Sequence, residues 1–159
     1  MICYLDSSAL VKRYVLEPGT AEVERLISEA DAVGTAWISL VEVVAALTKA
    51  VRLGALASEE GDSAIRSFEG DWPDLVRLQV TELLVGVAAG LARKRGLRGY
   101  DAVQLAAATL WQDNLETSVT VVTFDRQLWA AARQEGMIVR PEGLVSNSDT
   151  NAERSDSTS

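Results

Sequence analysis

The sequence of 159 residues contains no histidine and only one cysteine. Without histidine the chain cannot build a Ser-His-Asp triad or a histidine-based zinc site, and no imidazole can serve as a general acid or base. One cysteine excludes an internal disulfide and a cysteine-based zinc site, which favours a cytoplasmic protein. Cys3 lies in an apolar run and is expected to be a buried hydrophobic side chain. Any catalysis must therefore use carboxylates, hydroxyls, Lys or Arg, or a bound metal.

Signals for membranes and for a basic surface are also missing. No apolar stretch is long enough to span a bilayer, and the first residues run into a strand-like segment without a charged region or cleavage site. The net charge is −8, which argues against a protein that holds nucleic acid through a broad basic face. Part of this negative charge lies in the residues from Glu142 onward, and part lies in four acidic residues of the main body.

The remaining composition, with 48% apolar and 24% charged residues, is that of one globular domain. Strand-like segments alternate with helical patterns along the chain. The strands are expected at residues 2–5, 32–36, 75–80, 118–124 and 137–140. This order predicts an α/β fold with a mostly parallel central sheet of about four to five strands and helices on both faces. Residues 1–141 would form the domain, and residues 142–159 an acidic, disordered tail.

Four acidic residues stand at the ends of predicted strands or the beginnings of predicted helices: Asp6, Glu42, Asp101 and Asp125. In open parallel sheets, ligands bind beyond the carboxyl ends of the strands, so these side chains are expected to converge there. Clustered carboxylates repel one another unless a cation lies between them. Oxygen ligands suit Mg²⁺ or Mn²⁺, and such ions promote phosphate chemistry. The pattern therefore predicts a divalent-metal site.

Each acid also has a purely structural interpretation. Asp6 and Asp125 could cap the helices that follow them, and Asp101 is favourable in the first turn of a helix. Glu42 could form a capping box with Ser39 and only bond the backbone. Taken together these interpretations are weaker, because unpaired carboxylates beside apolar segments are costly. The capping box of Glu42 is the strongest of them.

The segments around these acids, YLDSSALVKRY, SLVEVVAAL, YDAVQLAAA and VVTFDRQL, resemble the PIN-domain family over residues 1–140. Within this family the segments resemble the VapC-like toxins of bacterial and archaeal toxin–antitoxin pairs. The resemblance implies a Mg²⁺- or Mn²⁺-dependent ribonuclease that forms a homodimer and is inhibited by a small antitoxin. It also implies a catalytic quartet of Asp6, Glu42, Asp101 and Asp125, with Ser8 and Thr123 as polar residues lining the site.

Within this quartet we expect Asp6, Asp101 and Asp125 to bind metal, and Glu42 to bind a second ion or to orient the attacking water. Hydrolysis by water would leave 5′-phosphate and 3′-hydroxyl ends. Two alternatives belong to other classes: a catalytically silent PIN-like module that binds RNA or protein, and a phosphatase with an Asp nucleophile. The second is disfavoured because Ser8 stands where such enzymes carry another acid.

Three further features have two interpretations each. Arg95 and Arg98 belong to a basic cluster that could contact the RNA backbone or only complement a helix dipole. Trp37 could stack on a base, although packing is the commoner role of tryptophan. The apolar faces of the second and third predicted helices could belong to the core or form a groove for a partner helix. Those faces consist of Leu26, Ile27, Val43, Val44 and Leu47.

Overall fold

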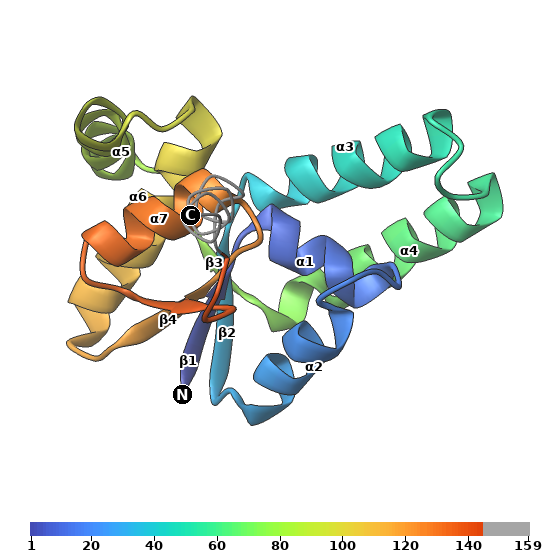
Figure 1. Cartoon of the computed structure of the whole chain (residues 1–159), viewed down its shortest axis with the longest axis horizontal. Coiled ribbons are helices and arrows are strands. Elements are labelled where there is room, and N and C mark those ends of the chain that lie inside the picture. Colours follow the sequence, from blue (N-terminus) through green and yellow to red (C-terminus); the bar gives the residue numbers. More distant parts are fainter. Residues whose placement is uncertain (145–159) are drawn as a thin grey trace, which may run out of the picture.

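Five short strands form an all-parallel sheet in the centre of the molecule (Figure 1), and the computed structural model describes residues 1–144. The strands are β1 (Ile2–Leu5), β2 (Ala32–Ala36), β3 (Val76–Leu78), β4 (Val119–Val122) and β5 (Ile138–Arg140). Their order is β3-β2-β1-β4-β5, so β1 is the central strand. The predicted fold class and parallel sheet are confirmed.

Seven α-helices connect the strands and cover both faces of the sheet (Figure 1). They are α1 (Ser7–Tyr14), α2 (Thr20–Glu29), α3 (Ser39–Arg52), α4 (Ser58–Asp71), α5 (Glu82–Arg95), α6 (Gly99–Leu115) and α7 (Arg126–Gln134), and a 3₁₀ turn spans Trp72–Asp74. None of these helices is both long and apolar enough to cross a bilayer. Because helices lie on both faces, the central strands are buried on both sides and read as apolar runs.

The alternation of side chains along β1 divides the core into two halves. Tyr4 packs with α5, α6 and α7 on one face of the sheet. Cys3 and Leu5 pack with α1 to α4 on the other face, and the burial of Cys3 is as predicted. Val43 and Leu47 of α3 are buried in the second half of the core. These α3 residues therefore form part of the core and do not offer a groove to a partner.

The first two helices begin at caps of different kinds. The side chain of Asp6 caps α1, as one of its two sequence interpretations predicted, by accepting a hydrogen bond from the backbone N–H of Ala9. The cap of α2 is Gly19, at a φ of +97°. A Cβ atom on this glycine would lie 2.5 Å from the ring of Phe124, so both backbone conformation and space require glycine there.

The predicted strands were also slightly too long. The strand expected at residues 75–80 is limited to Val76–Leu78, and the one at residues 118–124 to Val119–Val122. The chain leaves the sheet where the acidic residues begin. Most of the predicted tail, residues 145–159, lies outside the described residues.

Candidate active site

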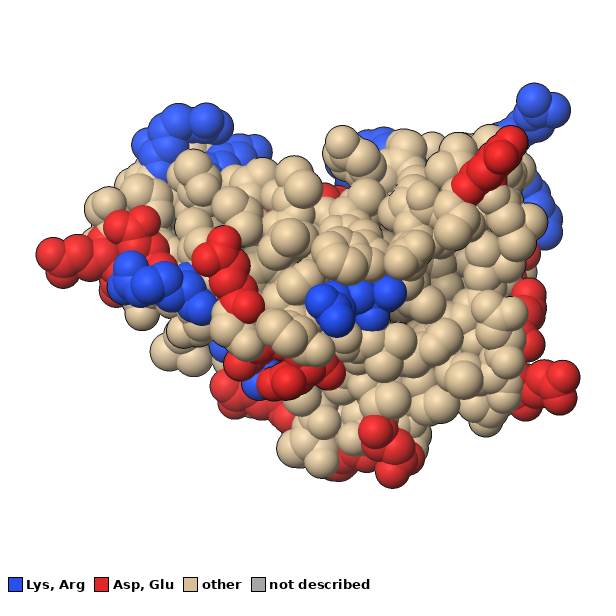
Figure 2. Space-filling view, turned by 180° about the vertical axis from the view of Figure 1, so that it is seen from behind, with Lys and Arg blue, Asp and Glu red and all other residues tan. Residues whose placement is uncertain are grey.

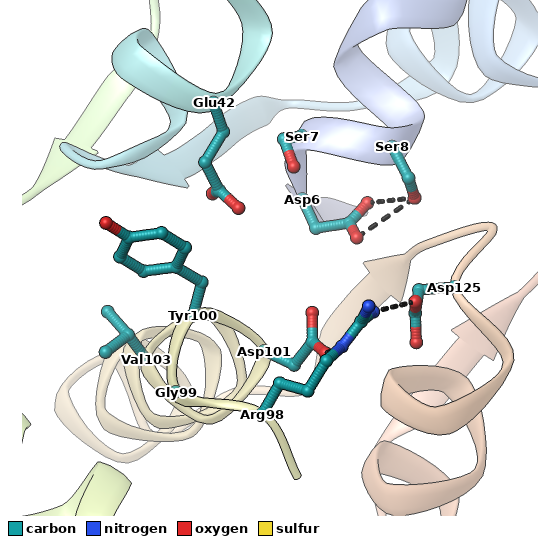
Figure 3. Close-up of a pocket in the computed structure, with 10 residues that line it drawn as sticks. All are labelled: Asp6, Ser7, Ser8, Glu42, Arg98, Gly99, Tyr100, Asp101, Val103 and Asp125. Carbon is teal, nitrogen blue, oxygen red and sulfur yellow. Dashed lines mark hydrogen bonds and ion pairs between the residues drawn. The ribbon is translucent and has the colours of Figure 1, made fainter. Parts of the chain in front are cut away.

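A cavity of about 670 Å³ opens at the carboxyl end of the sheet, where β1 and β4 end and α3 and α6 begin (Figure 3). All four acids selected from the sequence line it: Asp6, Glu42, Asp101 and Asp125. They come from four segments that are far apart in the chain, and they point toward a common space (Figure 3). Ser8 and Arg98, which were predicted as substrate-binding residues, line the same cavity.

Asp6 is the most buried of the four acids, with 3% of its surface exposed. Its carboxylate accepts hydrogen bonds from Ser8 Oγ at 2.7 Å, Thr123 Oγ1 at 2.8 Å and the backbone N–H of Ala9 at 3.0 Å. Burial raises the pKa of Asp6 to about 7, although these three hydrogen bonds favour the charged form and oppose the rise. The helix cap and the cavity share one carboxylate, so the structural and functional interpretations of Asp6 are compatible.

Two hydroxyl groups connect Asp6 to the loop after β4. Ser8 Oγ donates to Asp6 and accepts from the backbone N–H of Phe124 at 2.8 Å. Thr123 Oγ1 donates to Asp6 and accepts from the backbone N–H of Asp125 at 3.1 Å. Thr123 is fully buried and does not line the cavity. These bonds fix the ends of β1 and β4 relative to each other.

Asp125 and Asp101 share one cation, the guanidinium of Arg98 (Figure 3). Arg98 Nε donates to Asp101 Oδ2 at 2.9 Å, and Arg98 Nη2 donates to Asp125 Oδ2 at 2.8 Å. The other oxygen of Asp125 accepts from the backbone N–H of Leu128 at 2.9 Å and caps α7. Burial raises the pKa of Asp101, and the neighbouring Asp125 raises it further while Arg98 lowers it. Arg98 therefore opposes the effects of burial and of the neighbouring acid on Asp101.

Glu42 does not form the capping box considered for it, since α3 begins without any side-chain cap. Its Oε2 accepts a hydrogen bond of 2.5 Å from Nε2 of Gln104, a residue of α6 that is 1% exposed. The same Nε2 donates to Ser39 Oγ at 2.9 Å, and the hydroxyl of Tyr4 donates to Gln104 Oε1 at 2.5 Å. The buried amide is thereby oriented so that only donors face the carboxylate. Burial raises the pKa of Glu42, and the bond from Gln104 lowers it.

Gln104 and Tyr4 were not selected from the sequence. One signal was available, because a glutamine three residues after Asp101 lies on the same helical face in an otherwise apolar, Ala-rich segment. A buried amide needs partners, and the partners had to lie on other elements. Which elements supply them could not be read from the local pattern.

The two arginines predicted to bind substrate lie in different surroundings. Arg98 lines the cavity, whereas Arg95 does not. Arg95 joins α5 to α7 through Glu135, at 2.5 Å, and through Gln134, at 3.0 Å. Trp37 is 40% exposed and also lies outside the cavity wall.

The donor set fits a hard divalent cation, because carboxylate oxygens are the ligands that Mg²⁺ and Mn²⁺ prefer. Burial raises the pKa values of Asp6, Glu42 and Asp101, so their charged forms carry a desolvation cost that a bound cation would offset. Among residues 1–144, however, no three acidic side chains stand close enough together to hold one ion as they are. Binding would require the carboxylates to close around the cation.

A sequence model of the PIN domain matches residues 3–134. The chain belongs to the PIN domain family. Ribonuclease VapC45 of Mycobacterium tuberculosis is 34% identical to this PIN domain over 143 residues, which cover 90% of this chain and 97% of that protein. The resemblance found in the sequence motifs, including the VapC-like branch, is confirmed.

Solved structures agree with this assignment at the level of the fold. PAE2754 from Pyrobaculum aerophilum has a TM-score of 0.61 to this PIN domain at 22% identity, covering 87% of this chain and 83% of that one. A toxin–antitoxin complex from Klebsiella pneumoniae contains a chain with a TM-score of 0.60 at 13% identity, covering 80% of this chain and 90% of that one. At these identities the likeness concerns the fold alone.

Proposed function

We propose that this PIN domain is a divalent-metal-dependent endoribonuclease that acts as the toxin of a toxin–antitoxin pair. The observation that carries the proposal is the convergence of four carboxylates from distant segments on one cavity. The relationship to Ribonuclease VapC45 over nearly the whole length of both chains supports RNA as the substrate. The retention of all four acids favours an active enzyme over a silent binding module.

Asp6, Asp101 and Asp125 would hold the metal ion, and Glu42 would bind a second ion or orient the attacking water. Bound Mg²⁺ or Mn²⁺ would lower the pKa of water and stabilise the leaving oxygen of a phosphodiester. Asp6 must be ionised to contribute, and a nearby dication favours its ionised form despite its raised pKa.

Neighbouring side chains would orient the carboxylates of Asp6 and Glu42 for these roles. The hydroxyls of Ser8 and Thr123 direct both oxygens of Asp6, and a fixed carboxylate loses less freedom when it binds an ion. Gln104 presents N–H donors to Glu42 and so favours its charged, proton-accepting form. Such a carboxylate can accept a hydrogen bond from the attacking water and align it with the phosphorus.

An Asp-nucleophile phosphatase is less consistent with the cavity. Ser8 occupies the place of the second acid, and its hydroxyl donates to Asp6. A nucleophilic Asp6 would then lack a neighbouring acid to protonate the leaving group.

We also propose two protein partners. The first is a small antitoxin, by analogy with the complex from Klebsiella pneumoniae. The second is another copy of this chain, which would cover an apolar surface patch formed by Trp37, Val41 and Val80. Val41 is 70% exposed in the single chain, and a homodimer would remove this patch from water.

The catalytic proposal is tested by incubating the purified protein with total RNA and Mn²⁺, with and without EDTA. Asp6→Asn and Asp101→Asn should each reduce cleavage by roughly 100-fold or more, because each removes a ligand charge. Asp113→Asn is the matched control, since Asp113 lies exposed near the end of α6, the helix that carries Asp101. Undiminished Mn²⁺-dependent cleavage by Asp101→Asn would contradict the proposal.

A further inference from the structure

Arg98 is placed unusually for a surface arginine. Its side chain is 71% exposed, yet its guanidinium bridges two acids of the cavity that are only 14% and 24% exposed, Asp101 and Asp125. The guanidinium donates to Asp101 through Nε and to Asp125 through Nη2. Figure 3 shows the guanidinium between these two carboxylates, and Arg98 lines the cavity.

The guanidinium compensates charge that the fold itself concentrates. Asp101 is fixed by the first turn of α6, and Asp125 is fixed by its capping bond to Leu128 at the start of α7. These two backbone positions place both carboxylates within hydrogen-bonding distance of one guanidinium. Arginine does not lose its proton in proteins, so Arg98 supplies a permanent positive charge at this place.

A metal ion and this guanidinium would compete for the same oxygens. Asp101 and Asp125 are two of the three acids assigned to the ion, and two cations between the same pair of carboxylates would repel each other. The bridge of Arg98 is exposed to water, and exposed ion pairs contribute little to stability. A divalent ion can therefore displace the guanidinium at a small cost.

The released guanidinium would stay close to the reaction. Arg98 directly precedes α6, and the neighbouring Leu97 is buried in the core, so the backbone holds the side chain at the cavity. The planar fork that bonds two carboxylates can bond two phosphate oxygens in the same way. Arg95 cannot substitute for it, because its fork is already bonded to Glu135 and Gln134.

We propose that Arg98 is the resident counter-cation of the metal-free site, and that a divalent ion replaces it between Asp101 and Asp125 and frees it to bind an RNA phosphate. This inference rests on the proposed function and adds a role for Arg98 in both states. It predicts effects of opposite sign on metal and on RNA, which a purely structural arginine would not produce.

The experiment measures Mn²⁺ binding to the full chain by calorimetry without RNA. Arg98→Gln should bind Mn²⁺ about 3- to 10-fold more tightly than wild type, because the competing cation is gone. Arg98→Lys should be intermediate, because one ammonium group lacks the fork that bridges both acids. Arg126→Gln is the matched control for the loss of a nearby positive charge, since Arg126 is exposed and directly follows Asp125.

A second measurement uses a fluorescent single-stranded RNA with phosphorothioate linkages, which slow its cleavage, and saturating Mn²⁺. Arg98→Gln should weaken RNA binding by roughly 10-fold, and Arg126→Gln should do so much less. If Arg98→Gln binds Mn²⁺ no more tightly than Arg126→Gln does, the role of Arg98 as counter-cation is overturned. If Arg98→Gln binds the RNA as tightly as wild type does, the transfer of Arg98 to a phosphate is overturned. If wild type binds no Mn²⁺ at all, the proposed function itself fails, which is a distinct result.

Discussion

Individual side chains in this PIN domain serve the fold and the site at the same time. Asp6 and Asp125 each use one oxygen to cap a helix and leave the other oriented toward the cavity or its hydroxyl partners. The structural interpretations of these two residues were therefore correct but incomplete. A cap fixes the carboxylate in place, which is also what a metal ligand needs.

The burial of Asp6 makes the stability of the metal-free protein depend on pH. Its folded-state pKa of about 7 lies above the value near 3.9 of an unfolded aspartate. Between these pH values the folded protein binds more protons than the unfolded chain, so the free energy of unfolding falls as the pH rises. Above about pH 7 this contribution no longer changes.

We therefore expect Asp6→Asn to be more stable than wild type at pH 8 in EDTA, by about 2–4 kcal/mol. The difference in melting temperature should shrink as the pH is lowered toward 5. Thermal unfolding of both proteins between pH 5 and pH 8 measures this difference. Asp62→Asn, on the exposed side of α4, is the control. A difference that does not change with pH would show that the charge of buried Asp6 is not its cause.

Gln104 is predicted to position Glu42. Gln104→Leu should cost about 1–3 kcal/mol, because Tyr4 and Ser39 lose their buried partner. RNA cleavage should fall at least 10-fold in kcat, since Glu42 loses the donor that orients it. Tyr4→Phe is the companion variant, because it removes the hydroxyl that orients the amide but leaves Nε2 bonded to Ser39 and Glu42; it should lower kcat less than Gln104→Leu. Undiminished kcat in Gln104→Leu would show that the positioning role is wrong.

At the scale of elements, the periodicity of apolar residues was sufficient to predict the strands and the helices, but it did not predict the residues at which they begin and end. Asp6, Ser7 and Ser8 are all good caps, and the local sequence cannot choose among them. The cap is decided by the pairing of β1 with β4. The backbone N–H of Asp6 continues this pairing by donating to the carbonyl of Val122, so the helix begins only after Asp6. The contact of Gln104 with Glu42 likewise joins residues 62 positions apart, beyond the reach of any local pattern.

The helix α6, which carries Asp101, packs on β2. Gly34 of β2 lies against the ring of Trp111 in α6, and a Cβ atom there would approach the ring to 2.5 Å. Gly34→Ala should therefore displace α6 and destabilise the protein by about 1–3 kcal/mol, with a loss of cleavage.

Gly90→Ala in α5 is the contrasting variant, because a Cβ atom at this position would have no other atom within 4 Å. It should stabilise the helix by roughly 0.5–1 kcal/mol and leave cleavage unchanged. Chemical denaturation of both variants checks the pair. Equal effects of the two substitutions would contradict the role assigned to the contact between Gly34 and Trp111.

At the scale of the whole molecule, the charge pattern bears on how the proposed RNA substrate would bind. Figure 2 shows basic side chains at separate places on one face, interspersed with acidic ones, and a wide area without charge. This view agrees with the net charge of −8, which had argued against a broad basic surface. Binding of RNA would then depend on the metal ion and on few arginines, so its affinity should decrease only moderately with salt.

The apolar patch of Trp37, Val41 and Val80 leads to the last prediction, which concerns assembly. If a second copy covers this patch, the protein should elute as a dimer, with twice the chain mass of 17.1 kDa. Val41→Glu places a charge in the patch and should shift the protein to monomers, because burying an unpaired charge is costly. Light scattering coupled to size exclusion measures the mass. Leu53→Glu, at the other end of α3 and 68% exposed, is the matched control and should stay dimeric. A dimer that survives Val41→Glu would place the contact between copies on another surface.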